Sequence, residues 1–208
     1  MRRSVSFEKG EIGSTPSPLS RRIVLLLATL AGICWAGALT MLIWGGVDRQ
    51  QPYDAPERMV YYILIIAAAA LTFTPVERQF RLTGLAVEGV FGTALLLYTL
   101  AFVPPPTAWL LSPPDAPVYA VMALAVFWFC SSLAMPPLYA VGQRLFRQRA
   151  RRYDRRRARR QAYEIGLLAA FVIILAGLRT LTPVAVALVV LIIGVAEVLF
   201  LSFIEPEP

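Results

Sequence analysis

Two carboxylates stand inside long apolar stretches of the sequence. Glu88 lies within 85–103 and Glu197 within 165–204, each between apolar or small neighbours. An ionisable side chain in a membrane-spanning helix is costly, so it is a functional-site hypothesis by default. At a rise of ~1.5 Å per residue, both carboxylates should lie roughly 9 to 10 Å from the same membrane face. We therefore expect them at one depth.

A pair of prolines falls at the same expected depth. Pro136 and Pro137 follow Ser131 and Ser132 in the apolar stretch 118–143. Paired prolines remove two backbone donors, and broken helices beside carboxylates are a common way to build ion or substrate sites in transporters. The pattern suggests one polar pocket for an ion, a proton or a small solute. Its candidate residues are Glu88, Glu197, Ser131, Ser132 and Pro136.

A structural interpretation of the two carboxylates competes with this pocket. Gly84, Glu88 and Gly92 share a helix face at i, i+4 and i+8, and Gly194 shares one with Glu197. Small residues at this spacing let helices approach closely in lipid. Either carboxylate could then be a polar contact between helices or part of a partner interface, with Arg81 as a candidate ion-pair partner for Glu88.

The sequence lacks the residues that most catalytic and cofactor-binding sites require. The 208 residues include no histidine, which excludes imidazole-ligated haem and Ser-His or Cys-His pairs. Cys34 and Cys130 fall in apolar stretches and are expected to pack as small hydrophobes. No Gly-rich phosphate loop or GxSxG elbow occurs. We expect no metal, no cofactor and no catalytic residue, although a lipid-modifying enzyme with a glutamate base remains an alternative.

The composition places these residues in membrane-spanning helices. Hydrophobic residues make up 58% of the chain and the mean hydropathy is +0.64, against about 45–50% apolar residues in a soluble domain. We expect an all-α integral membrane protein with six transmembrane helices, because the last apolar stretch is long enough for two spans. The expected spans are 23–44, 59–74, 84–103, 118–142, 164–180 and 183–204.

An arginine-rich segment separates the fourth and fifth expected spans. Residues 144–160 hold ten arginines and one aspartate, a net charge of +9. Such a segment should stay on the cytoplasmic side, where anionic lipid is present. We expect a basic helical loop that contacts anionic lipid or an acidic partner, and nucleic acid is the least favoured ligand. The ten are Arg144, Arg147, Arg149, Arg151, Arg152, Arg155, Arg156, Arg157, Arg159 and Arg160.

The remaining charges give an orientation. Six spans with both termini inside leave only Arg49, Arg58 and Arg179 of the 20 basic residues outside. This asymmetry predicts a multi-pass protein of the cytoplasmic membrane. Residues 1–20 and 205–208 would form cytoplasmic tails, the first of them disordered. A five-span alternative would place the C-terminus outside.

Further small-residue faces predict where helices pack. Ala28, Gly32 and Ala36 form one such face, which could meet another span or a second copy of the chain. Gly166 and Gly177 form another in the fifth expected span. The sequence thus favours a non-enzymatic subunit or scaffold of a membrane complex, with a transporter or channel component as the alternative.

Overall fold

The computed structural model describes residues 21–145 and 154–203 of the chain. This part contains six helices and no strand. The predicted tails 1–20 and 205–208, and Arg147, Arg149, Arg151 and Arg152 of the basic segment, lie outside the described residues. The helices are α1 (Arg21–Ile43), α2 (Pro56–Phe80), α3 (Leu85–Phe102), α4 (Ala116–Leu145), α6 (Arg155–Gly177) and α7 (Pro183–Phe203).

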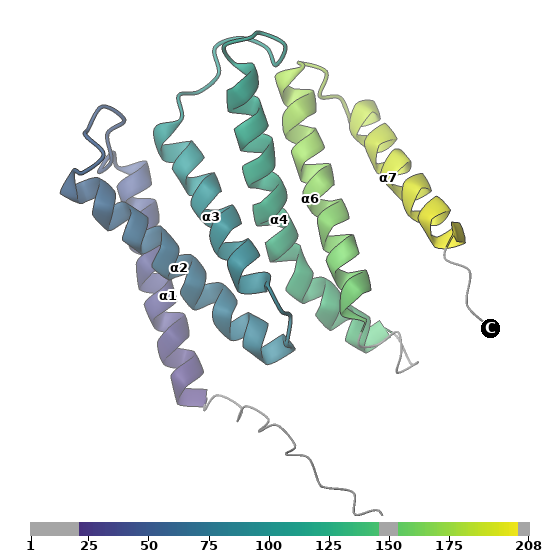
Figure 1. The fold of residues 1–208 in the computed structure, drawn as a ribbon, viewed down its shortest axis with the longest axis horizontal. Helices are drawn as coiled ribbons and strands as arrows, with labels where there is room; N and C mark the ends of the chain where they lie inside the picture. The colour runs from purple at the N-terminus through teal and green to yellow at the C-terminus, as the bar shows by residue number, and fades with distance from the viewer. Residues whose placement is uncertain (1–20, 146–153, 204–208) are drawn as a thin grey trace, which may run out of the picture.

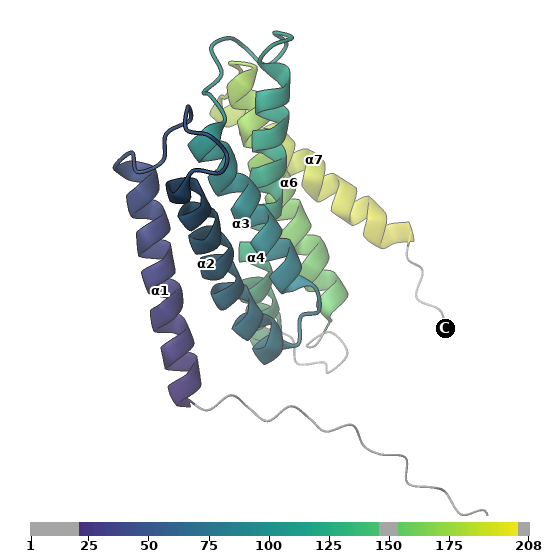
Figure 2. The ribbon, with the colours of Figure 1, turned by 60° about the vertical axis from the view of Figure 1, so that its left-hand side comes forward.

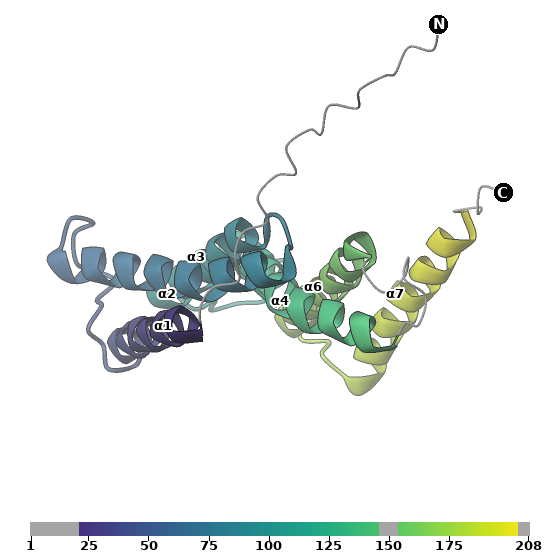
Figure 3. The same ribbon diagram turned by 90° about the horizontal axis from the view of Figure 1, so that it is seen from below.

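Consecutive helices run in opposite directions and each packs on the next one in the sequence (Figure 1). Figure 3 shows that α2, α3, α4, α6 and α7 follow one another in a curved row, with α1 against one side of α2. α7 packs mainly on α6 and leans away from the other helices (Figure 2). Short connections between apolar helices favour this up-and-down arrangement.

Five of the described helices, α1 to α4 and α6, are each long and apolar enough to cross a membrane. α7 is also apolar over Pro183–Leu199. The all-helical class and the membrane-type helices thus agree with the sequence. The number of crossings and the orientation stay predictions.

Two helices that contain prolines extend past the ends expected for them. α2 continues through Pro75 to Phe80, six residues past the expected end of its span, and stops where Arg81 adopts a left-handed conformation with φ of 54°. α4 continues through Pro136 and Pro137 to Leu145 as one helix, so the prolines do not break it (Figure 1). A proline removes one backbone hydrogen bond without ending a helix whose neighbours hold it in place.

Glycines set the closest helix contacts. A Cβ atom on Gly92 of α3 would lie 2.7 Å from the Trp128 backbone of α4, and one on Gly166 of α6 would lie 2.6 Å from the Phe127 carbonyl oxygen. A Cβ atom on Gly177 would lie 2.8 Å from the ring of Tyr119, a side chain of α4. All three glycines belong to the small-residue faces described from the sequence.

The buried face of α1 differs from the expected one. Ala28, Gly32 and Ala36 are exposed, and nothing lies within 4 Å of the position a Gly32 Cβ would take. α1 instead packs through Ala31, Cys34 and Ala38. The spacing of small residues identified a possible contact face. A different set of small residues, on another face of the same helix, forms the contact with α2. A contact of the first face with a second copy stays a prediction.

One buried arginine organises the loop between α1 and α2. Arg58 is only 4% exposed, and its guanidinium donates to the carbonyl oxygens of Asp48 (3.2 Å) and Arg49 (2.8 Å). The same group lies 4.4 Å from the ring centroid of Phe102. Arg58 therefore stabilises the loop rather than facing solvent.

Candidate functional site

The first turns of α6 carry the described part of the basic segment. The helix begins at Arg155, where the carboxylate of Asp154 accepts a hydrogen bond from the Arg157 backbone N–H at 3.1 Å. An aspartate is a favourable N-cap because it satisfies a backbone donor that has no partner inside the helix. The arginines that were expected in a separate basic loop thus include the first residues of the fifth membrane-type helix.

The helical periodicity directs these arginines toward different neighbours. Consecutive residues of an α-helix point about 100° apart, and residues three or four apart share a face. The contacts of their long side chains decide the rest: Arg155, Arg156 and Arg159 line one cavity with Leu82 and Thr83 of the α2–α3 turn. Arg160 points toward α7 instead.

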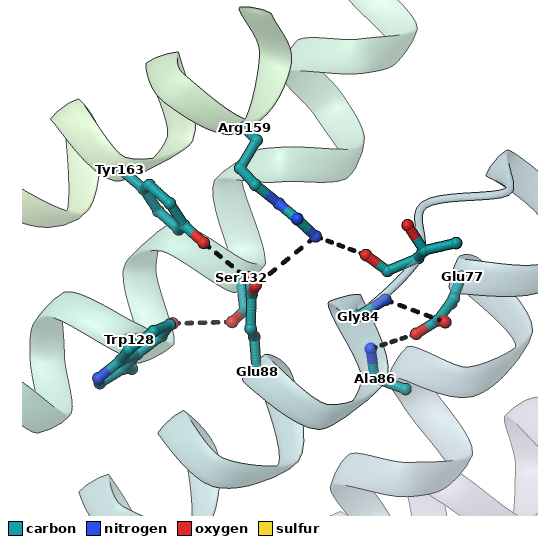
Figure 4. A network of polar contacts seen from close by, with 9 residues as sticks. Glu77, Gly84, Ala86, Glu88, Trp128, Ser132, Arg159 and Tyr163 are labelled. Carbon is teal, nitrogen blue, oxygen red and sulfur yellow. Dashed lines mark hydrogen bonds and ion pairs between the residues drawn. The ribbon is translucent and has the colours of Figure 1, made fainter. Parts of the chain in front are cut away.

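Glu88 is held by two residues of α6 (Figure 4). Its Oε1 atom lies 3.6 Å from Nη2 of Arg159 and accepts a hydrogen bond of 3.1 Å from the Tyr163 hydroxyl. Nη2 of Arg159 also donates to the Thr83 carbonyl oxygen at 2.5 Å. These contacts tie the start of α3 to α6. They give Glu88 the partner Arg159 rather than Arg81, the candidate from the sequence.

Glu77 completes this corner and was not singled out from the sequence. Its two carboxylate oxygens accept hydrogen bonds from the backbone N–H groups of Gly84 (3.2 Å) and Ala86 (2.6 Å), as Figure 4 shows. The carboxylate thus satisfies free donors at the N-terminus of α3 from the preceding helix. Its spacing, seven residues before a glycine in a short turn, could have suggested this role.

Glu197 meets α6 on a different side. Its carboxylate forms an ion pair and hydrogen bond with Nη2 of Arg160, whose Nε atom lies 3.9 Å from Glu164. Since Arg159 and Arg160 are consecutive, Glu88 and Glu197 meet α6 at nearly the same level. They point to separate arginines from separate helices, so the structure does not bring them into one pocket.

The two predicted serines are buried in the helix interface of α4. The Ser132 hydroxyl donates to the Trp128 carbonyl oxygen at 2.8 Å within its own helix. Ser131 is 1% exposed, and its hydroxyl has no hydrogen-bond partner among the described residues. It lies against Gly166 of α6. Pro136 lies one turn further along α4, inside the helix.

The remaining predicted packing residues have mixed surroundings. Gly84 adopts φ of 89° in the α2–α3 turn, with Nη2 of Arg159 3.3 Å from the position of a Cβ atom. The left-handed conformation favours glycine there. Gly194 of α7 has nothing within 4 Å of its Cβ position. Arg144, in the last turn of α4, is exposed.

A cavity of about 550 Å³ opens beside this network. It lies between the α2–α3 turn, α4 and the start of α6, and combines charged with apolar walls. Its described lining residues are Leu82, Thr83, Met135, Asp154, Arg155, Arg156 and Arg159. A second, apolar cavity of about 270 Å³ lies between α2 and α3 around Tyr62 and Tyr98. Only the first places several charged groups together.

No known protein provides a function by similarity. The sequence matches no family model and no curated protein, and the fold matches no solved structure. Among residues 21–145 and 154–203, no group of three or more Cys, Asp or Glu side chains is arranged to hold a metal ion. The chemistry of the site must therefore be argued from its own residues.

Proposed function

We propose that this chain is a non-enzymatic subunit or scaffold of a membrane complex, and that it contacts anionic lipid or an acidic partner through Arg144–Arg160. One observation supports this most directly: four of the five arginines of α6 fall into two groups. Arg159 and Arg160 pair with Glu88 and Glu197, whereas Arg155 and Arg156 are exposed. The first group joins helices, and the second is available to bind an anion.

The distribution of charge supports a cytoplasmic position for this end of the molecule. We call it the basic end, defined by the helix termini at Arg21, Phe80, Leu85, Leu145 and Arg155, which all lie low in Figure 1. The opposite end carries three basic residues, of which one, Arg58, is buried. Cytoplasmic ends of membrane proteins carry the excess of Lys and Arg. The proposed arrangement is six crossings of the cytoplasmic membrane with both chain termini inside.

Co-purification tests the proposed function. The protein extracted from membranes in a mild detergent should bring a partner in stoichiometric amount, and replacing Arg155 and Arg156 by Gln should weaken that association if the partner is acidic. A partner retained by both proteins would indicate contacts through the helices. A single monodisperse protein from every membrane source would contradict the role of subunit.

A transporter or channel component is a second candidate. The observation in its favour is a pair of buried hydroxyls, on Thr93 of α3 and Ser131 of α4, that have no hydrogen-bond partner among the described residues. Buried hydroxyls without partners are unfavourable unless water or a ligand meets them. Ion or proton flux in proteoliposomes that is lost in Glu88→Gln or Glu197→Gln, with normal expression, would support this candidate. Flux that is unchanged in both variants would remove it.

A further inference from the structure

We propose that the charged cavity at the basic end binds the phosphate group of an anionic phospholipid. This inference rests on the proposed function, because it assumes that the basic end lies at the headgroup level of a membrane. It goes further by assigning a defined site and a ligand class to residues that would otherwise attract anions only diffusely.

The charge of the cavity suits a phosphate. Its lining residues include Arg155, Arg156, Arg159 and Asp154, a net charge of +2 from three positive side chains and one negative side chain. Arginine binds phosphate through a planar fork of donors, often with two parallel hydrogen bonds. A phosphate monoester or diester is thus the natural counter-charge for this cluster.

One of these arginines is fixed and two are available. Arg159 is anchored by the Thr83 carbonyl oxygen and by Glu88. Arg155 and Arg156 are exposed, and neither forms an ion pair with another residue in the described part of the chain. They are also the first two residues of α6, so their backbone N–H groups and the helix dipole add to the attraction for an anion.

The apolar wall distinguishes a lipid from a small anion. Leu82 and Met135 lie at the base of the same cavity and are almost fully buried, at 0% and 2% exposure, so the apolar surface open to a ligand comes mainly from the aliphatic stems of the arginines and the Thr83 methyl group. A volume of about 550 Å³ is many times the roughly 30 Å³ of one water molecule. The cavity can hold a headgroup together with the glycerol that carries the acyl chains. Free phosphate would leave the apolar wall without a partner.

The position of the cavity also favours lipid over an acidic peptide. It lies where α2 ends and where α3 and α6 begin, and all three are membrane-type helices. The ends of membrane-spanning helices lie at the level of lipid headgroups. A phospholipid would thus find its phosphate beside the guanidinium groups and its glycerol beside the arginine stems and the Thr83 methyl group.

Binding of defined ligands to the full-length protein in detergent tests the proposal. The probes are dioctanoyl phosphatidic acid, dioctanoyl phosphatidylcholine, glycerol 3-phosphate and inorganic phosphate, with bound adducts counted by native mass spectrometry and ligand-induced thermal stabilisation as a second readout. We expect phosphatidic acid to bind most tightly. Glycerol 3-phosphate and inorganic phosphate should bind much more weakly, because they cannot use the apolar wall.

Two matched double variants locate the site. Replacing Arg155 and Arg156 by Gln should weaken phosphatidic acid binding about 30-fold, from about a factor of five for each basic residue at an anionic lipid. Replacing Arg78 and Arg144 by Gln removes the same charge from exposed positions of the basic end outside the cavity. This control should change the affinity less than about 3-fold.

A third variant should strengthen binding. Asp154→Asn keeps a good N-cap residue but removes the negative charge from the cavity wall. We expect phosphatidic acid to bind about 5-fold more tightly with unchanged thermal stability of the unliganded protein. Misfolding does not produce a gain of affinity, so this arm remains informative if the double variants fold poorly.

The contrary outcomes are distinct. Equal loss in the two double variants would show diffuse attraction and overturn the cavity as the site. Equal affinity for inorganic phosphate and phosphatidic acid would overturn the lipid assignment, and equal affinity for phosphatidylcholine would overturn the role of net charge. None of these results depends on co-purification. The lipid site can therefore be supported when the subunit role fails, and the subunit role can be supported when the lipid site fails.

Discussion

At the scale of single residues, the charged groups of the apolar region are used in pairs. Glu88 meets Arg159 and Tyr163, and Glu197 meets Arg160, so each carboxylate joins its helix to α6. Removing one member of such a pair is unfavourable because the other is left without its counter-charge in a region of low dielectric. These pairs therefore hold the position of α3 and α7 relative to α6.

The Glu88 contact can be separated into its parts by substitution. Glu88→Gln keeps the size of the side chain and an acceptor for the Tyr163 hydroxyl, but removes the charge opposite Arg159. We expect the free energy of unfolding to fall by about 1–2 kcal/mol, as for a hydrogen-bonded charged group. Thermal unfolding in detergent, followed by tryptophan fluorescence, measures the change.

The matched control for this variant is Glu57→Gln, an exposed acid in the first turn of α2. It should change the stability by less than about 0.5 kcal/mol. If Glu88→Gln is as stable as this control yet abolishes a proteoliposome flux, Glu88 has a transport role rather than a structural one.

At the scale of the helices, close approach of backbones is what joins α4 to α6 and α3. The position of a Gly166 Cβ lies 2.0 Å from the Ser131 Oγ and 2.6 Å from a backbone oxygen of α4. The Ser131 side chain could rotate away, but the Phe127 carbonyl cannot move without shifting the helix. The contact between α4 and α6 is therefore specified by the absence of a side chain.

Substitution of these glycines should separate tight contacts from open ones. Gly166→Ala should destabilise the protein by about 1–3 kcal/mol, the usual range for overpacking. Gly32→Ala and Gly194→Ala place the same methyl group where nothing lies within 4 Å. They should be neutral or stabilising by up to about 1 kcal/mol, because alanine is the better helix former. Equal stability of all three variants, measured by thermal unfolding, would refute the close α4–α6 contact.

The helices could be predicted from the sequence to a greater extent than their contacts. Apolar stretches define spans by length, so α3 differs from its expected bounds by one residue at each end. The start of α6 differs from the expected position 164 because its arginines were assigned to a separate helical loop, whereas the Asp154 N-cap lets the helix begin within them. Hydropathy reports where a chain can cross lipid, and a helix can extend beyond that limit.

The partners of the charged residues could not be predicted from spacing. Arg81 lies two turns before Glu88 and looked like its partner, but the left-handed conformation of Arg81 ends α2 and separates the two residues by a turn. Arg159, 71 positions away in the sequence, takes that place. Contacts between distant segments depend on the rotation of each helix about its axis, which the sequence pattern of nearly all-apolar helices leaves open.

At the scale of the whole molecule, the proposals depend on which side of the membrane the basic end faces. Guanidinium groups are too costly to carry through the bilayer, so the arginine-rich connection between α4 and α6 should remain cytoplasmic. The turn between α6 and α7, with exposed Arg179 and Thr180, lies at the opposite end (Figure 1). This turn should therefore face outward. One position in the arginine-rich connection and one in this turn form a matched pair for labelling.

Single cysteines at these two positions test the orientation. In a background with Cys34 and Cys130 replaced by alanine, Ala150→Cys should react with a membrane-impermeant maleimide only after the cells are opened. Thr180→Cys should react in intact cells, because it lies at the other end of α6. Labelling of residue 150 in intact cells would show the opposite orientation, with the arginines away from the anionic leaflet. The cavity would then face a surface with little negative charge, where the electrostatic attraction of about 1 kcal/mol per basic residue is lost.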